Sequence, residues 1–231
     1  MTFLIVTDCH GGLYTKHLVN HDRYAENLGY DKPDVALFLG DNYFDDMEIV
    51  VKWLQNQNWD IPLLGVFGNH DSPTFLDRLG ITNIHMKVVT VNGLRIGGFG
   101  GAVRYKAGHD DILFTQEESI SLLNDLPKSD IFITHSNPQY REFDEVDITP
   151  PPKSFAEMIK RKIVGYEPVL KQVEKPFKTG THAGLVGIAD YIETKQPLFH
   201  FYGHIHDRTT EQHGKTTSKS FYCVETLKVD L

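Results

Sequence analysis

The stretch FLIVTDCHG, residues 3–11, joins a short apolar run to a cluster of polar side chains. The apolar part has no alternation of apolar and polar residues, which is typical of a strand buried on both faces of a sheet. The same arrangement returns in VALFLGDN (35–42) and LLGVFGNHD (63–71), where an apolar run again ends in Asp, Asn or His. Three such runs in the first third of the chain predict neighbouring strands of one buried sheet.

Helix-like patterns separate these runs. Residues 46–55 carry apolar side chains at helical spacing. Residues 72–80 begin with Ser-Pro and end with Gly, which are typical of a helix N-cap, a first helical turn and a helix C-terminus. The alternation of strand and helix predicts an α/β fold with a parallel sheet and helices packed against it.

Later parts of the chain add a hairpin and further strands. The pair Asn92-Gly93 separates two strand-like runs, 86–91 and 94–99, which predicts a β-hairpin. The other expected elements are helices at 116–126 and 183–192 and strands at 131–134, 198–202, 220–224 and 226–229.

The composition bounds the class of protein. With 231 residues, 40% of them apolar and 23% charged, the chain is expected to form one soluble domain, residues 1–231. It has no apolar stretch of about 20 residues that would cross a membrane. The absence of a signal pattern and of a disulfide framework favours a cytoplasmic location. A net charge of −8 argues against a dedicated nucleic-acid binder.

Metal-ligand side chains follow five of the expected strands. In an open α/β sheet, ligands bind at the carboxyl ends of the strands, so we expect these groups to meet at one edge. Asp8 and His10 are two residues apart, and so are His204 and His206. In an extended chain this spacing would point both side chains of a pair to one side. The seven donors are Asp8, His10, Asp41, Asn69, His135, His204 and His206.

Seven donors without a thiolate pattern are too many for one tetrahedral ion and about right for two. The natural bridging ligand is Asp41, between the Asp/His groups. We therefore expect two divalent metal ions. Imidazole, carboxylate and amide donors suit manganese, our first choice, with Fe, Zn, Co or Ni as alternatives.

The motifs D-x-H (8–10), G-D-N (40–42), G-N-H-D (68–71), H (135) and G-H-x-H (203–206) together resemble the calcineurin-like metallophosphoesterase family. The second motif continues as GDNYFDD and not as the G-D-x-x-D-R-G of the family's protein phosphatases, so the resemblance is to the broad family. The resemblance implies a four-layer α/β/β/α sandwich with a dinuclear metal site at the C-terminal ends of the strands.

A looser similarity, to small phosphodiesterases of the cyclic-nucleotide type, rests on the glycine-rich residues 97–101 and on residues 181–204. The fourth motif departs from those relatives, because His135 is followed by Ser-Asn-Pro where they tend to have Gly-Pro-Pro.

The resemblance also implies roles for individual residues. One ion would be held by Asp8, His10, Asp41 and His206, and the other by Asp41, Asn69, His135 and His204. The implied reaction is in-line attack on phosphorus by a metal-bridging hydroxide.

Three further residues complete the expected site. His70 is the expected acid for the leaving oxygen, with Asp71 orienting it and raising its pKa. Arg104 is expected to contact a phosphate oxygen.

Three functions remain open at this point. The first is hydrolysis of a small nucleotide-like phosphodiester or phosphomonoester. The second is a nuclease, which would need a basic track that this acidic chain does not offer. The third is a non-catalytic scaffold, which would be expected to have lost ligands that are all present here.

Residues 136–181, rich in Lys, Glu and Pro, are expected to be an insertion or cap that forms one wall of the substrate pocket, with a helix-like piece at 155–163. Among nearby residues, Asp45 and Asp46 are expected to cap the helix that follows them. Cys9 is expected to be a small filler, and His182 to open a helix or contact the substrate.

Overall fold

The computed structural model describes residues 1–11, 32–107, 111–154, 157–158, 161 and 168–230. The chain forms two units: Met1–Gln139 with Lys178–Leu231, which we call the core unit, and Tyr140–Phe177, which we call the arm unit. Most of the helix expected at 155–163 falls outside the described residues. Within the described residues, none of the helices has the length and apolar character that crossing a membrane requires.

The first sheet of the core unit contains the three apolar runs that open the sequence. Its strands follow the order β15-β1-β2-β3-β4. The pairs β1–β2 and β2–β3 are parallel, as predicted. Strand β4, which was not predicted, pairs parallel with β3, and β15 pairs antiparallel with β1. The strands are β1 (Thr2–Thr7), β2 (Val35–Phe38), β3 (Leu63–Gly65), β4 (Thr82–Asn83) and β15 (Cys223–Lys228).

The second sheet has six strands in the order β13-β14-β12-β9-β6-β5. Its centre is parallel, because β6, β9, β12 and β14 all run in the same direction. The predicted hairpin is confirmed, since β5 and β6 pair antiparallel around Asn92-Gly93. The strands are β5 (Lys87–Val91), β6 (Leu94–Phe99), β9 (Ile131–Thr134), β12 (Phe199–Tyr202), β13 (Thr210–His213) and β14 (Thr216–Ser220).

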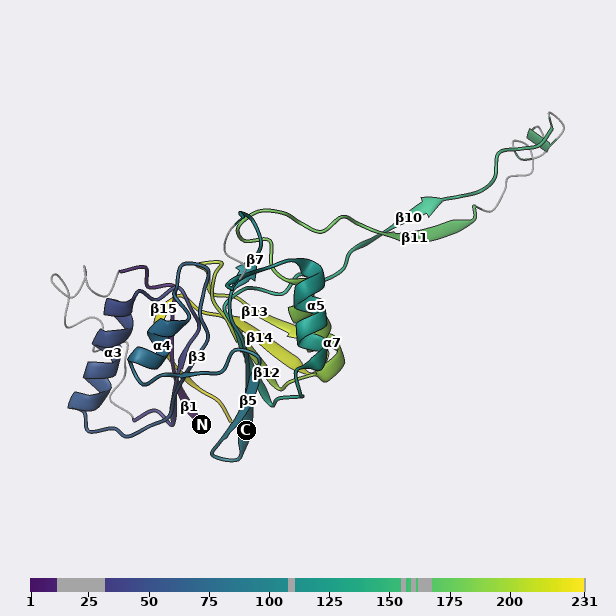
Figure 1. Ribbon diagram of the computed structural model, residues 1–231. Helices are drawn as coiled ribbons and strands as arrows, with labels where there is room; N and C mark the ends of the chain where they lie inside the picture. Colours follow the sequence, from purple (N-terminus) through teal and green to yellow (C-terminus); the bar gives the residue numbers. More distant parts are fainter. Residues whose placement is uncertain (12–31, 108–110, 155–156, 159–160, 162–167, 231) are drawn as a thin grey trace. The chain divides into compact units, whose positions relative to one another are not determined.

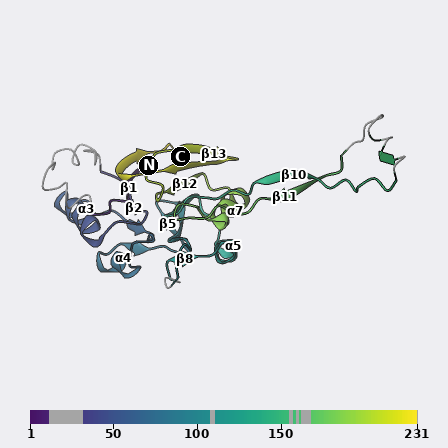
Figure 2. The same ribbon diagram turned by 90° about the horizontal axis from the view of Figure 1, so that it is seen from above.

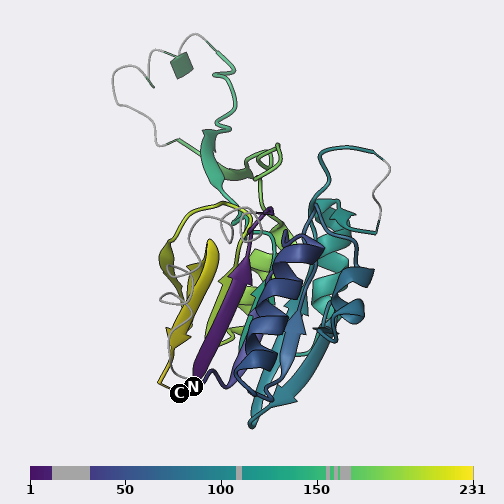
Figure 3. The same cartoon turned by 90° about the vertical axis from the view of Figure 1, so that its left-hand side faces the viewer.

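Among the described residues, four helices cover the two sheets. They lie in two pairs on opposite sides of the strands (Figures 1 and 2). Helices α3 and α4 lie against the first sheet, and Figure 3 shows α3 in front of this sheet, alongside β1. Helices α5 and α7 pack on the second sheet. The helices are α3 (Phe44–Asn56), α4 (Thr74–Arg78), α5 (Gln116–Asp125) and α7 (Val186–Lys195). Between β6 and α5 the chain forms a small parallel pair of strands, β7 (Ala102–Val103) and β8 (Leu113–Phe114).

The buried side chains explain this layering. Along β1, Phe3 and Ile5 belong to the cluster between the two sheets, whereas Leu4 and Val6 belong to the cluster under α3 and α4. Strand β1 is therefore buried on both faces, which is why its sequence shows no alternation. The α/β fold with two sheets and flanking helices is confirmed.

Some predicted boundaries are wrong. The last two strands lie at 216–220 and 223–228 and not at 220–224 and 226–229, and β13 was not predicted at all. Helix α7 begins at Val186 with Leu185 at its N-cap, so His182 does not open it. Helix α3 has Tyr43 at its N-cap with no side-chain hydrogen bond, so neither Asp45 nor Asp46 caps it.

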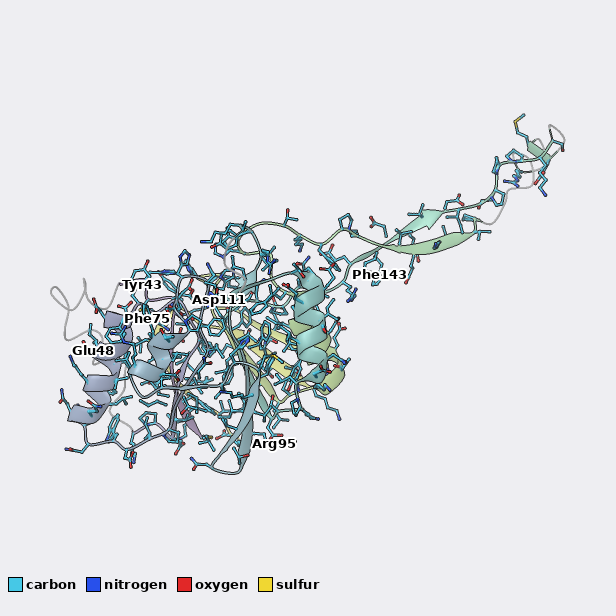
Figure 4. All side chains as sticks on the ribbon, viewed as in Figure 1. Tyr43, Glu48, Phe75, Arg95, Asp111 and Phe143 are labelled. Carbon is cyan, nitrogen blue, oxygen red and sulfur yellow. The ribbon has the colours of Figure 1, made fainter. Side chains whose placement is uncertain are left out.

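The arm unit contains a two-stranded antiparallel hairpin of β10 (Phe143–Asp147) and β11 (Leu170–Glu174). All ten of these residues are exposed. Phe143, labelled in Figure 4, is about half exposed.

Candidate metal centre

The seven predicted ligands lie in loops that follow strands of both sheets. Asp8, Asp41 and Asn69 follow β1, β2 and β3 of the first sheet, and His135 and His204 follow β9 and β12 of the second. The core between the sheets brings the two sets of strand ends together.

One group consists of Asp8, His10 and His206, and we call it the Asp8 group. The Nε2 atoms of His10 and His206 are 3.1 Å apart. Oδ1 of Asp8 lies 3.4 Å from Nε2 of His206 and 3.9 Å from Nε2 of His10. Three potential donor atoms therefore converge on one small volume.

The second group consists of Asp41, His135 and His204, and we call it the Asp41 group. Nε2 of His135 lies 3.0 Å from Nδ1 of His204 and 3.4 Å from Oδ2 of Asp41. The amide oxygen of Asn69 is 3.0 Å from the same Nε2 atom, so it joins this group.

Asp41 lies between the two groups. Its Oδ2 atom is 3.8 Å from Nε2 of His10 in the Asp8 group and 3.4 Å from Nε2 of His135 in its own. One carboxylate oxygen of Asp41 therefore lies close to a histidine of each group.

Hydrogen bonds outside the groups orient the ligands. Nδ1 of His135 faces the carbonyl of Leu39 at 2.9 Å, and Nε2 of His204 faces the carbonyl of Thr181 at 2.7 Å. A carbonyl accepts only from a protonated nitrogen, so in each ring the other nitrogen is the one available to a cation. Oδ2 of Asp8 accepts from the Thr7 hydroxyl, which leaves Oδ1 directed to its own group.

The backbone at the ligands is strained. Five of the seven have φ in the left-handed region: Asp8 (52°), His10 (46°), Asp41 (49°), His204 (68°) and His206 (52°). Residues other than glycine rarely adopt this region, and each instance costs on the order of 1–3 kcal/mol. The expectation that each pair points to one side because its chain is extended is therefore wrong: the side chains converge through left-handed turns.

The electrostatics of the Asp41 group also favour a cation. Burial raises the pKa of Asp41, but His135 and His70 together hold this pKa below its ordinary value. Burial lowers the pKa of His135, but the carboxylates of Asp41, Asp8 and Asp71 together raise it to about 9. Burial and the neighbouring His135 lower the pKa of His204 to about 3. Protonation is therefore favoured on His135 but not on the adjacent His204, whereas a cation would interact favourably with both rings.

The residues present fit two divalent cations. Among the described residues, the buried Oδ1 of Asp8 has no hydrogen-bond partner, which is costly for a buried carboxylate oxygen unless an ion binds it. The donors are imidazole nitrogens, carboxylates and one amide, the set that suits divalent transition metals.

The loop that carries His70 is tied to Asp41 in both directions. The backbone N–H of His70 donates to Oδ1 of Asp41 at 2.8 Å, and Oδ2 of Asp71 accepts from the backbone N–H groups of Asp41 and Gly68 at 2.7 Å each. The other oxygen of Asp71 makes no hydrogen bond within the described part of the chain. In this structure Asp71 therefore joins two loops. The described contacts do not support the expectation that Asp71 orients the His70 ring.

His70 itself is exposed, and its ring centroid lies 5.5 Å from that of His10. Burial, followed by the charge of Asp41, raises the pKa of Asp71 to about 7. Arg104 donates to the carbonyl of Leu113 and pairs with Glu118 at 3.1 Å. Its guanidinium is thus committed to groups of the protein itself.

Three tyrosines near the predicted ligands, Tyr43, Tyr105 and Tyr222, were not assigned a role from the sequence. Tyr105 accepts a hydrogen bond from the amide of Asn69, and the ring of Tyr222 lies 5.4 Å from that of His206. The ring of His182, weighed from the sequence, lies 4.7 Å from that of His204. Tyr43, 6.0 Å from the ring of His10, lies at the upper edge of the core unit in Figure 4, at the opposite end from Arg95.

Two residues near the motifs have structural environments. The buried carboxylate of Asp46 accepts from the backbone N–H of Gly11 at 2.6 Å. Cys9 is buried in the cluster under α3, and its sulfur lies 3.8 Å from that of Cys223. Burial, the largest cause, raises the pKa of the Cys9 thiol, which agrees with a filler.

Comparison with known proteins identifies the class. The sequence pattern of the calcineurin-like phosphoesterases matches residues 1–208, and the chain belongs to this family. It is therefore a metallophosphoesterase, a hydrolase of phosphate esters. A search of curated protein sequences found no match.

Solved structures agree on the fold. The protein TT1561 of Thermus thermophilus has a TM-score of 0.54 at 16% identity, with 95% of this chain and 88% of that chain covered. A phosphopantetheinyl hydrolase from Mycobacterium tuberculosis has a TM-score of 0.53 at 15% identity, with 99% of this chain and 96% of that chain covered. At these identities the similarity concerns the fold alone.

Proposed function

We propose that this protein is a dinuclear, manganese-dependent phosphodiesterase that acts on a small, nucleotide-like substrate. The observation that carries the proposal is the arrangement of the two ligand groups around Asp41, whose Oδ2 atom lies within 4 Å of a histidine from each group. When bound, two cations would polarise the phosphoryl oxygens and activate water as the nucleophile.

His70 is the residue that we assign as the acid. Its backbone is fixed on the Asp41 carboxylate, while its ring is exposed beside His10. An exposed imidazole next to the ions, but not among their ligands, is placed to donate a proton to the leaving oxygen. Asn69, the preceding residue, ties the acid to the Asp41 group.

The charges near the site support a diester over a monoester. A monoester dianion carries one more negative charge than a diester, and a cationic side chain commonly compensates it. Arg104, the cation expected from the sequence, pairs with Glu118 instead. The chain's net charge of −8 further favours a small substrate over a nucleic acid.

The donor set supports manganese. Imidazole, carboxylate and amide ligands without thiolate suit Mn, Fe, Co or Zn. The rings of Tyr43, His182 and Tyr222 near the ligands could stack on a planar base, which supports a nucleotide-like substrate.

The test is a hydrolysis screen with EDTA-stripped protein, to which Mn, Co, Ni, Zn or Mg is added back. The substrates are bis-p-nitrophenyl phosphate, p-nitrophenyl phosphate, cyclic nucleotides and single-stranded DNA. We expect Mn to restore activity, with the diester hydrolysed faster than the monoester. A preference for the monoester would refute the diester assignment, and a preference for DNA would favour a nuclease.

A further inference from the structure

Asn69 differs from the other ligands because its side chain has one donor atom and one atom that repels a cation. Only Oδ1 of an amide can bind a metal ion, since Nδ2 carries two hydrogens. In the structure Oδ1 lies 3.0 Å from Nε2 of His135, on the side of the Asp41 group. The contacts of Nδ2 therefore decide how firmly the oxygen is held in that place.

Nδ2 of Asn69 donates to the hydroxyl of Tyr105 at 3.3 Å. No other hydrogen bond of Nδ2 occurs within the described residues. Asn69 is only 3% exposed, so without this hydroxyl the buried amide would lose its acceptor.

Tyr105 is held by its own packing. Its side chain contacts a small apolar cluster that includes Phe67, Ala102 and Leu113. Phe67 lies two residues before Asn69, and its carbonyl accepts from the backbone N–H of Gly101 at 2.7 Å. The phenol and the loop that carries Asn69 are thus parts of one packed body.

We propose that Tyr105 is a positioning residue that fixes the Asn69 amide with its oxygen toward the Asp41 group. With a cation on Oδ1, the amide presents Nδ2 to the phenol, and the phenol oxygen accepts. The ion and the tyrosine thus favour the same orientation, and each strengthens the other's hold on the amide. Contacts that orient metal ligands typically contribute 10–100-fold to metal affinity.

The test measures binding of Mn²⁺ alone to EDTA-stripped protein, by calorimetry and by the EPR signal of free Mn²⁺. The inference rests on the proposed two-metal site. In Tyr105→Phe the ring and its packing remain and only the hydroxyl is lost. We expect one Mn²⁺ to bind about 10-fold more weakly and the other to bind as in the wild type.

A second background separates positioning from a general structural effect. In Asn69→Asp both side-chain atoms are oxygens, so the orientation of the group no longer matters. We expect Tyr105→Phe to change Mn²⁺ affinity less than about 2-fold in that background. Tyr202→Phe, which removes a hydroxyl that lies 3.3 Å from the hydroxyl of Thr209, is the matched control and is expected to bind both ions normally.

The outcomes are distinguishable. If Tyr105→Phe binds both ions as tightly as the wild type, or weakens binding equally in the Asn69→Asp background, the inference is overturned and the proposed function stands. If the wild type itself binds fewer than two Mn²⁺ ions, the proposed function and the inference fall together.

Discussion

Replacing Gly68 by alanine tests whether the geometry around Asp41 controls metal binding. Gly68 does not have a positive φ, so alanine is acceptable to its backbone, and only space opposes it. A Cβ atom there would lie 2.5 Å from the backbone nitrogen of Asp41 and 2.7 Å from its Cγ, and would overlap Oδ1. The new methyl group would therefore press on the carboxylate that lies between the two ligand groups.

The size of the effect follows from these distances. Non-bonded carbons prefer a separation of about 3.5 Å or more, so Cγ of Asp41 would have to retreat by about 0.8 Å. Metal–ligand distances tolerate only about 0.2 Å. We expect both ions to bind at least 10–100-fold more weakly, which corresponds to about 1.4–2.7 kcal/mol for each ion.

The assay compares metal content and thermal unfolding in two glycine variants. Gly98→Ala is the control, because its Cβ would lie 2.7 Å from Cγ1 and 2.8 Å from the carbonyl of Ile84, away from the ligands. Each variant should lose about 1–3 kcal/mol of stability from overpacking when metal-free, but only Gly68→Ala should lose metal. Wild-type metal affinity in Gly68→Ala would refute the role assigned to Asp41.

Three further predictions concern the acid, a buried histidine and the arm unit. His70→Ala should retain both ions and lose about 10²–10⁴-fold in turnover on a substrate with a poor leaving group, whereas Asp41→Ala should lose metal. Metal content is checked by atomic absorption. Unchanged turnover in His70→Ala would contradict the assignment of His70 as the acid. Burial lowers the pKa of His200 to about 3, whereas a histidine in an unfolded chain has a pKa of about 6.5. Between about pH 3 and pH 6.5 the unfolded state therefore binds more protons than the folded state, and the free energy of unfolding falls as the pH falls through this window. Denaturant unfolding of metal-free protein should show this slope reduced by up to about 1.4 kcal/mol per pH unit in His200→Gln, and identical slopes would show that His200 does not titrate in this way. Replacing residues 140–177 by a short Gly-Ser linker should leave the metal content and the melting temperature of the core unit nearly unchanged. The reason is that no buried apolar cluster among the described residues contains a residue of the arm unit. A loss of metal would contradict this prediction.

The first half of the fold was predictable because its information is local. The continuous apolar runs of β1 and β2 are strands buried on both faces, and Asn92-Gly93 determines its own turn. Neither inference needs knowledge of distant residues. The division into two sheets came instead from the family resemblance, since apolar runs alone do not say which strands pair.

The C-terminal strands were misplaced because their burial depends on distant partners. Strand β14 has the sequence TTSKS, which lacks the apolar residues that mark a buried strand, yet Thr216, Ser218 and Ser220 are buried. Their hydroxyls bond to the carbonyl of Pro197, to Nδ1 of His200 and to the carbonyl of Asp207. A buried hydroxyl is tolerated only with such a partner, and these partners lie elsewhere in the chain.

The candidate site shows the same division between local and distant information. The ligand types could be read from the strand ends, but the left-handed turns at the ligands could not, because asparagine, aspartate and histidine adopt them only where the surrounding structure requires it. Tyr105 gave no signal in the sequence, since its role depends on where its loop returns to Asn69. Arg104 was expected to contact a phosphate, but its guanidinium hydrogen-bonds to the carbonyl of Leu113 and pairs with Glu118, which lie 9 and 14 residues further along the chain.

The strained turns and the buried carboxylates have a common physical explanation. Five ligands in left-handed conformations and the buried Asp8 and Asp41 carboxylates all destabilise the metal-free fold. The apolar layers of the two sheets supply the stability that holds these groups together. The left-handed turns bring the donor atoms of each group within 4.8 Å of one another. A bound cation would compensate the buried negative charge of Asp8 and Asp41. The interactions that destabilise the metal-free fold are thus the ones that favour metal binding.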